Sequence, residues 1–370
     1  MMKLMFRELL AALICIMLTV CSVGFAEQQY PMTIKDSAGR VVTLQMPVQR
    51  IIVCNSDAAE AVLMLGAGDK IVGVADTVKS KGFYFPTLKN KQSVGTFTAL
   101  DYEMMGAIAK QGDMIVPDII VIGYTYPGKS YGIDATAKAL VPFKNITCIG
   151  LDFYQPENMT EEMKLLGTIL NKETEAQDYI NWYNERTANI QKAVSGASTP
   201  KVYVEWSAKG NDLSAMGPKS GAGAMLSAVN CFNIVSKLSD PYPVVNWEYV
   251  IAQKPDIMIV RQTLPSNAKA IGWAAPPSSD ALGLEKSVNA IKDRAAASSV
   301  PAVKNNKVYI FDWDFMAGPD QVVGLTYLAK VIHPEADLDP ESVYKEYLQL
   351  LGLGWTKDRI FVYPDIISKK

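Results

Sequence analysis

The stretch Glu173–Gly196, ETEAQDYINWYNERTANIQKAVSG, lies near the middle of a chain of 370 residues. Side chains at steps of three or four form one face, the spacing of an amphipathic helix; they are Ala176, Tyr179, Ile180, Tyr183, Thr187, Ile190 and Val194. No proline or glycine interrupts the stretch before Gly196, where we expect the helix to end. About 24 helical residues at ~1.5 Å each form a rod of roughly 35 Å. An ordinary surface helix is the alternative, but the similar flanking sequences favour a spacer between two lobes.

The sequence before this helix alternates short apolar runs with helical segments. Each run is hydrophobic throughout, which is typical of strands in a parallel sheet that helices cover on both faces. The predicted strands are Arg50–Cys54, Ile71–Val74, Asp118–Ile122 and Ile146–Leu151, and the predicted helices are Ala58–Leu65, capped by Asn55-Ser56-Asp57, and Asp101–Lys110. Met32–Gln45 alternates and turns at Gly39, which predicts a hairpin.

The sequence after the helix repeats this order. The predicted strands are Lys201–Glu205, Asp256–Val260 and Lys307–Asp312, and the predicted helices are Gly221–Val229, Trp247–Gln253, Gln321–Ile332 and Pro340–Leu351. One pair of segments is similar in the two halves, because Tyr102-Glu103 and Trp247-Glu248 each precede a Pro-Asp pair and a strand. We therefore predict an α/β fold of two doubly wound lobes with mostly parallel sheets, joined by a single long helix, with the ligand cleft between the lobes.

Composition places the chain among ordinary globular proteins of two-domain size. Hydrophobic residues make up 49% of the chain and charged residues 20%, and the formal net charge is -2. A nearly neutral balance provides no field for polyanions. With no recognisable nucleic-acid motif, we exclude nucleic acid as a partner.

The amino-terminal residues have the pattern of a secretory signal peptide. A positive start at Lys3 and Arg7 precedes the apolar run Leu9–Val20 and the small-residue cleavage signal Gly24-Phe25-Ala26. We expect cleavage after Ala26, so that residues 1–26 are removed and the protein is exported, periplasmic or at the cell surface. The alternatives are a lipoprotein that is cut before Cys21 and anchored through it, and an uncleaved membrane anchor.

Cysteine and histidine usage argues against a metal site. Of five cysteines, Cys15 and Cys21 lie in the signal, which leaves Cys54, Cys148 and Cys231, an odd number far apart. This spacing supports neither a disulfide framework nor a cysteine metal site, and we interpret the three as small buried apolar residues. The single histidine, His333, excludes a multi-histidine site.

Several sequence blocks, weak individually, follow a specific order and spacing. They are Arg50–Val53 with Ser56–Glu60 and Leu65–Val74, Val94-Gly95 with Asp101–Glu103, Pro117–Val121, Lys254–Ile259, Val300–Tyr309, and Gly324–Lys330 with His333–Glu335. Together they resemble the substrate-binding proteins of ABC importers for iron-siderophores, vitamin B12 or haem. The resemblance covers roughly Ile34–Glu335.

The resemblance implies an organisation and a set of partners. It implies an amino-terminal lobe over residues 27–157, a helical linker over 158–196 and a carboxyl-terminal lobe over 197–370. The partners would be a small-molecule metal chelate, the membrane permease of an ABC importer and, through the permease, its ATPase. We expect a monomer, no resident cofactor and no enzymatic activity.

Candidate ligand-binding residues directly follow the predicted strands. In open α/β sheets, ligands lie beyond the carboxyl ends of the strands. Aromatic side chains there suit a large, flat or partly apolar ligand, and an arginine can pair with carboxylate, phosphate or catecholate oxygens. Lys129 and Lys209 are further candidate cations, and the alternative for several of the aromatic residues is packing between lobes. The predicted ligand-binding residues are Asn55, Ser56, Tyr124, Tyr126, Tyr154, Trp206, Arg261 and Trp313.

Glu60 is the candidate contact with the permease. In the family that the chain resembles, a glutamate on the first helix of one lobe lies on the surface and meets an arginine of the permease, and a second glutamate does so in the other lobe. The position equivalent to that second glutamate carries Ala224. The sequence therefore leaves open whether the dock has two points or only Glu60, and the alternative for Glu60 is a solvated helix-start carboxylate.

The sequence leaves the ligand open. We favour capture of a ferric-siderophore-type iron complex, with a corrinoid or haem as alternatives. An exported α/β enzyme, such as a hydrolase or metal-dependent lyase, is a remote alternative, because no nucleophile or ligand cluster is evident at a strand exit. We name no catalytic residue and no metal ligand.

Overall fold

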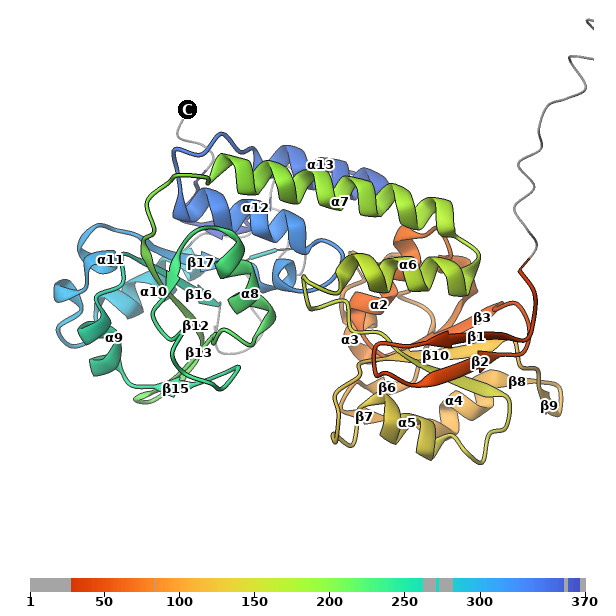
Figure 1. The fold of residues 1–370 in the computed structure, drawn as a ribbon. Helices are drawn as coiled ribbons and strands as arrows, with labels where there is room; N and C mark the ends of the chain where they lie inside the picture. Colours follow the sequence, from red (N-terminus) through yellow and green to blue (C-terminus); the bar gives the residue numbers. More distant parts are fainter. Residues whose placement is uncertain (1–27, 83, 262–270, 273–281, 356–358, 367–370) are drawn as a thin grey trace, which may run out of the picture.

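A computed structural model describes residues 28–82, 84–261, 271–272, 282–355 and 359–366. It shows two α/β lobes side by side, with helix α7 (Glu173–Ala193) running along one side of both (Figure 1). The predicted signal peptide over 1–26 and the alternative anchor at Cys21 lie outside the described residues. Within the described part, no helix has the length and apolar character needed to cross a membrane.

The amino-terminal lobe is built on a five-stranded, fully parallel sheet with the order β11-β10-β3-β4-β5. The strands are β3 (Arg50–Val53), β4 (Ile71–Val74), β5 (Gln92–Ser93), β10 (Ile119–Gly123) and β11 (Ile146–Gly150). The helices are α2 (Ser56–Met64), α3 (Asp76–Ser80), α4 (Tyr102–Ala109), α5 (Ile133–Ala139) and α6 (Met159–Leu170). Three hairpins complete the lobe, β1 (Met32–Lys35) with β2 (Val41–Leu44), β6 (Gly95–Thr96) with β7 (Ala99–Leu100), and β8 (Lys110–Gln111) with β9 (Met114–Ile115).

The carboxyl-terminal lobe has a seven-stranded mixed sheet, with the order β15-β13-β12-β16-β17-β18 and β14 paired with β12. The strands are β12 (Lys201–Lys209), β13 (Asp212–Ala215), β14 (Phe232–Asn233), β15 (Val244–Val245), β16 (Ile257–Arg261), β17 (Val308–Phe311) and β18 (Val362–Tyr363). The helices are α8 (Gly221–Ala228), α9 (Trp247–Gln253), α10 (Leu282–Lys292), α11 (Pro301–Lys304), α12 (Gln321–Ile332) and α13 (Pro340–Leu350), together with short 3₁₀ helices such as Trp313–Met316. The predicted α/β class is confirmed, although antiparallel pairs flank the parallel centre of this sheet.

The segment between the lobes contains two helices. Asn171, in the left-handed region at φ 56°, separates α6 from α7. Helix α7 ends at Ala193, three residues before Gly196, whose φ of 76° suits glycine. The face predicted from the sequence is the packed one, since all of its members are buried except the partly exposed Thr187.

Helix α7 is fastened to helices of the carboxyl-terminal lobe. The Tyr179 hydroxyl donates to the carbonyl oxygen of Pro319 at 2.7 Å, just before α12. On α13, the Glu346 carboxylate accepts from Trp182 Nε1 at 3.0 Å and pairs with Arg186 Nε at 2.9 Å. Helices α7, α12 and α13 therefore form a layer along the same side of the molecule (Figure 1).

Removing the Tyr179 hydroxyl tests this attachment. Tyr179→Phe leaves the buried carbonyl of Pro319 without its donor, so we expect the free energy of unfolding to fall by about 1 kcal/mol, measured by urea denaturation. Tyr183→Phe is the matched control, because the Tyr183 hydroxyl has no hydrogen bond within the described residues. Equal effects of the two variants would show that the Tyr179 bond contributes nothing.

Candidate functional site

The amino-terminal lobe forms its part of the site where its strand order reverses, between β3 and β10. Ligands bind at such points in open α/β sheets. Asn55 and Ser56 follow β3, and Tyr124 follows β10. The Asn55 side chain caps α2 by accepting from the Ala58 backbone N–H at 2.7 Å. These side chains share a pocket of about 290 Å³, lined by Asn55, Ser56, Thr77, Ser80, Lys81, Phe97, Tyr124 and Tyr126.

Aromatic rings gather beside this pocket. Tyr124 and Tyr126 have ring centroids 4.7 Å apart, and each is 5.8 Å from Tyr154. Phe97 and Tyr131 close the group, with their rings 5.8 Å apart. We call these five residues the N-lobe aromatic cluster. It brings together all three tyrosines that the sequence predicted as ligand-binding.

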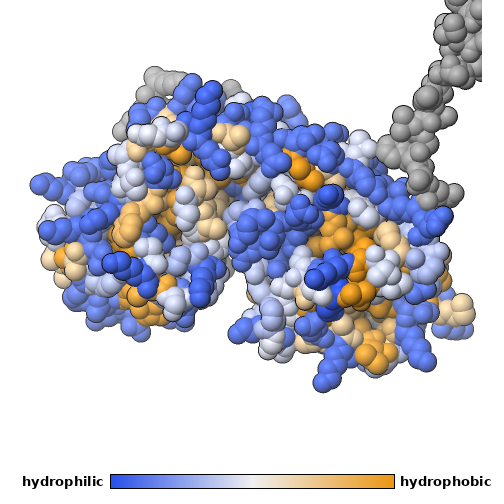
Figure 2. All heavy atoms as spheres, in the orientation of Figure 1, coloured by the Kyte–Doolittle hydropathy of each residue, from blue (hydrophilic) through white to orange (hydrophobic). Residues whose placement is uncertain are grey.

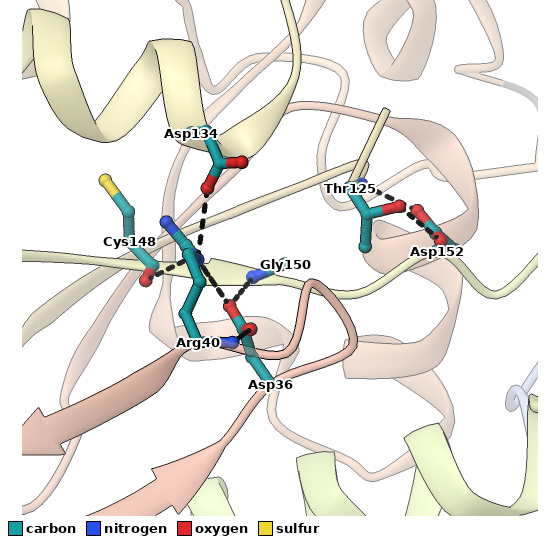
Figure 3. Close-up of polar contacts among 7 residues, drawn as sticks. All are labelled: Asp36, Arg40, Thr125, Asp134, Cys148, Gly150 and Asp152. Atoms are coloured by element: carbon teal, nitrogen blue, oxygen red, sulfur yellow. Dashed lines mark hydrogen bonds and ion pairs between the residues drawn. The ribbon is translucent and has the colours of Figure 1, made fainter. Parts of the chain in front are cut away.

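Buried hydrogen bonds fix the two loops that carry these tyrosines. Asp152 accepts from the backbone N–H of Thr125 at 2.7 Å and from its hydroxyl at 2.8 Å, which ties the loop after β10 to the loop after β11 (Figure 3). Beside it, Asp36 accepts from the Gly150 N–H at 2.8 Å and pairs with Arg40 at 2.6 Å, so the β1–β2 hairpin is held against β11 (Figure 3). The rings are therefore presented by loops whose polar groups are already paired.

The carboxyl-terminal lobe has a second group of rings. Trp206 lies 5.1 Å from Trp313 and 5.9 Å from Tyr242, measured between ring centroids. The guanidinium carbon of Arg261 lies over the Trp206 ring at 3.9 Å, a cation–π arrangement. We call Trp206, Tyr242, Arg261 and Trp313 the C-lobe aromatic cluster. Sequence reasoning placed Trp206 after a strand, but it lies within β12, at an irregularity in the pairing with β13, because β12 continues to Lys209.

The two clusters approach each other between the lobes. Burial first, and then Tyr154, Asp57 and Tyr242, raise the pKa of Tyr126, and Tyr242 belongs to the other lobe. Lys81 Nζ of the amino-terminal lobe lies 3.4 Å from Asp314 Oδ1 of the other lobe. The Gly318 N–H donates to the Phe153 carbonyl at 2.9 Å. The surface is hollowed between the lobes on the side away from α7 (Figure 2).

Comparison with known proteins gives the family. A family model described as periplasmic binding protein matches residues 51–314. This chain belongs to that family. A protein of Halobacterium salinarum named cobalamin-binding protein is 23% identical over 235 residues, which are 62% of this chain and only 58% of that relative. An uncharacterised ABC transporter substrate-binding lipoprotein of Bacillus subtilis is 21% identical over 316 residues, 83% of this chain and 87% of that one.

Solved structures share the fold. A TroA-like periplasmic binding protein from Veillonella parvula has a TM-score of 0.71 at 22% identity, covering 90% of this chain and 99% of its own. A molybdate-bound periplasmic binding protein from Haemophilus influenzae has a TM-score of 0.67 at 15% identity, covering 88% of this chain and 99% of its own. The predicted family and the two-lobed α/β fold are thus confirmed.

Glu60 is not where the resemblance placed it. Only 3% of the residue is exposed, so a surface contact with a permease is wrong for this side chain. Its Oε1 accepts from the Tyr84 hydroxyl at 3.0 Å and from the hydroxyl of Tyr347 on α13. The Tyr84 hydroxyl also lies 3.5 Å from Asp320 Oδ2. The position faces inward because α2 packs this side against the helices of the other lobe.

The surroundings of Glu60 favour its protonated form. Burial raises the pKa of Glu60 to about 8, although the Tyr347 hydrogen bond and the charge of Lys81 oppose the shift. Burial, and then the charge of Glu60, raise the pKa of Asp320 well above its usual range. Glu60 and Asp320 are therefore two neighbouring buried carboxyl groups that do not both ionise easily.

Lys81, Phe97 and Tyr242 belong to the site but escaped sequence reasoning. None directly follows one of the predicted strands, which was the only signal used. The expected cations Lys129 and Lys209 are instead exposed, on the loop after β10 and at the end of β12. Among the described residues, no group of three or more His, Cys, Asp or Glu is arranged to hold a metal ion. Cys54, Cys148 and Cys231 are free, and the first two are buried.

The pH dependence of stability tests the buried state of Glu60. Its pKa rises on folding, so folding binds protons, and stability is lost as the pH rises from about 4.5 to about 8. Glu60→Gln keeps both hydroxyl donors satisfied but cannot ionise. Between pH 5 and pH 8, we expect the free energy of unfolding of this variant to decrease by roughly 2–4 kcal/mol less than that of the parent protein.

The measurement is urea denaturation at a series of pH values. Glu161→Gln is the control, because Glu161 is exposed on α6, and its profile should match that of the parent protein. A parallel profile for Glu60→Gln and the parent would contradict a role for this buried carboxyl.

Proposed function

We propose that the protein is the substrate-binding component of an ABC importer and captures a ferric-siderophore-type iron complex between its lobes. The observation that carries this proposal is the pair of aromatic clusters on facing lobes, with Arg261 stacked on Trp206. Rings offer large contact area with little loss of conformational freedom. The partly buried Arg261 adds a fixed positive charge that suits carboxylate or catecholate oxygens.

This function is binding without turnover, by a monomer with no resident cofactor. Capture occurs outside the cytoplasmic membrane, as family membership and the amino-terminal signal pattern support. The lobes close only modestly on the ligand, because α7, α12 and α13 brace them along one side. The ligand then passes to the permease, through which the ATPase is the further partner.

A corrinoid is the second candidate ligand. The relative from Halobacterium salinarum is named a cobalamin-binding protein, and aromatic walls with few charges also suit a corrin ring. Haem is a third candidate ligand, and titration distinguishes it from the iron complex and the corrinoid.

For permease docking, a matched pair of glutamates replaces Glu60. Glu103 lies in the first turn of α4, capped by Asp101, and Glu248 lies in the first turn of α9, capped by Asn246. Both side chains are exposed. Helix α4 precedes a Pro-Asp pair and strand β10, which pairs with β3. Helix α9 likewise precedes a Pro-Asp pair and strand β16, which pairs with β12. In Figure 1 both helices lie below α7, one in each lobe, and we propose that one membrane partner contacts both.

Titration of the mature chain tests the ligand-binding proposal. The six tryptophans of the chain allow binding to be followed by fluorescence quenching. We expect saturable binding of a ferric catecholate or hydroxamate siderophore, with Kd raised at least tenfold in Trp206→Ala and Arg261→Ala. Trp247→Phe is the control, because Trp247 stacks with Arg294 outside the cleft and its loss should leave Kd unchanged.

Other results would redirect the proposal. Saturable binding of cyanocobalamin or haemin alone would replace the iron complex by that ligand. Binding that is indifferent to both cleft variants would move the site elsewhere, and chemical conversion of the ligand would favour an enzyme.

Uptake in cells tests the docking pair. Cells that lack the chain are complemented with the double variant Glu103→Arg/Glu248→Arg, and uptake of the bound ligand is measured. We expect uptake to fall at least tenfold while Kd of the purified variant stays unchanged, because reversed charges repel an arginine partner. The control Glu161→Arg/Glu285→Arg changes one exposed glutamate in each lobe and should retain uptake. Loss of uptake in both double variants would refute a specific role for the pair.

A further inference from the structure

The pocket at the amino end of α2 contains buried donors that have no acceptor. Asn55 is only 1% exposed, and its Oδ1 is already used by the Ala58 N–H. Its Nδ2 has no hydrogen-bond partner within the part of the chain that the structure describes, and neither has Oγ1 of Thr77, which also lines the pocket. A buried polar group left unpaired costs about 1–3 kcal/mol. The pocket therefore favours a ligand that brings acceptors.

The charge of the pocket lining points the same way. Its eight residues include one cation, Lys81, and no carboxylate. The amino terminus of α2, a helix of nine residues, adds backbone N–H groups and the positive end of the helix dipole. Lys81 reaches the pocket from the end of α3, so donors converge from two elements.

Four carboxyl groups act on Lys81: Asp314, Asp57, Glu60 and Asp320. Glu60 and Asp320 are buried, and burial raises the pKa of each, which favours their uncharged forms. Asp57 is buried, and it accepts from the Tyr124 hydroxyl at 2.8 Å and from the Ser56 hydroxyl at 3.1 Å. It is not part of the lining. Asp314 of the other lobe is 41% exposed at its side chain and pairs with Lys81. Among the four, Asp314 is thus the exposed carboxylate that pairs with the lysine, and it does so from the other lobe.

We propose that this pocket binds an anionic oxygen group, a carboxylate or a tetrahedral oxyanion, with Asn55 Nδ2, Thr77 Oγ1 and Lys81 Nζ as its donors. The volume of about 290 Å³ is at the lower limit for a small-molecule site. It holds one charged arm of a large chelate while the aromatic clusters hold the body, or it holds a free oxyanion by itself. The first case rests on the proposed function, and the second does not.

The experiment compares probes that differ in charge. Ferric citrate supplies carboxylates on an iron complex, ferrichrome is a ferric hydroxamate without free carboxylates, and molybdate and phosphate are free oxyanions. Binding of each to the mature chain is measured by titration calorimetry. We expect an anionic probe to bind, with Kd raised at least tenfold in Lys81→Gln and severalfold in Thr77→Val.

Asp314→Asn is expected to change the affinity for anionic probes in the opposite direction to Lys81→Gln. This change removes the exposed carboxylate that pairs with Lys81, so we expect anionic probes to bind severalfold more tightly, an effect that general damage to the fold cannot produce. Lys79→Gln is the charge control, because Lys79 lies on the same helix but outside the lining. Thermal melting of each variant identifies any that fail to fold.

The outcomes separate this inference from the proposed function. Lys81-dependent binding of molybdate or phosphate, with no binding of an iron complex, would support the anion pocket and contradict the proposed capture of an iron chelate. Binding of ferrichrome with the same Kd in parent and Lys81→Gln, and of no anionic probe, would keep chelate capture and overturn the anion pocket. Binding of ferric citrate that Lys81→Gln weakens and Asp314→Asn strengthens would support both.

Discussion

A buried carboxyl group lies at the joint between the lobes and adds to the contacts of Lys81 with Asp314 and of Gly318 with Phe153. Glu60 receives hydroxyl hydrogen bonds from Tyr84 of its own lobe and Tyr347 of the other. A buried polar group is tolerated only while its partners stay in place, so any rotation that separates these tyrosines exposes an unpaired group. Lys81, whose charge acts on Glu60, also lines the pocket, so the joint and the candidate site share this side chain.

Local patterns predicted the framework well. The apolar runs at Arg50–Val53 and Ile119–Gly123 became adjacent parallel strands, because such runs have few alternatives in an α/β chain. The face of α7 was also correct. The carboxyl-terminal sheet was less predictable, since β12 continues past Glu205 to pair with β13, and antiparallel pairing depends on a partner that short-range patterns do not show.

The site itself was predicted in part. The structure brings the strand-exit residues Tyr124, Tyr126, Tyr154, Arg261 and Trp313 into two aromatic clusters, because topology fixes where strands end. Their role in ligand binding stays a prediction. Lys81 and Tyr242 arrive from segments that are distant in sequence and lack a pattern. Glu60 shows the limit of transferring a role by resemblance, since a helix position says which residue is present but not which neighbour covers it.

The brace formed by α7, α12 and α13 has a consequence for selectivity. If the lobes cannot swing far, the spacing between the aromatic walls is largely set before any ligand arrives. Such a cleft selects ligands by their thickness. A ligand that matches the spacing contacts both aromatic walls, whereas a thinner ligand contacts them poorly, because the walls cannot move closer together. A cleft that selects ligands by thickness would then bind fewer different ligands.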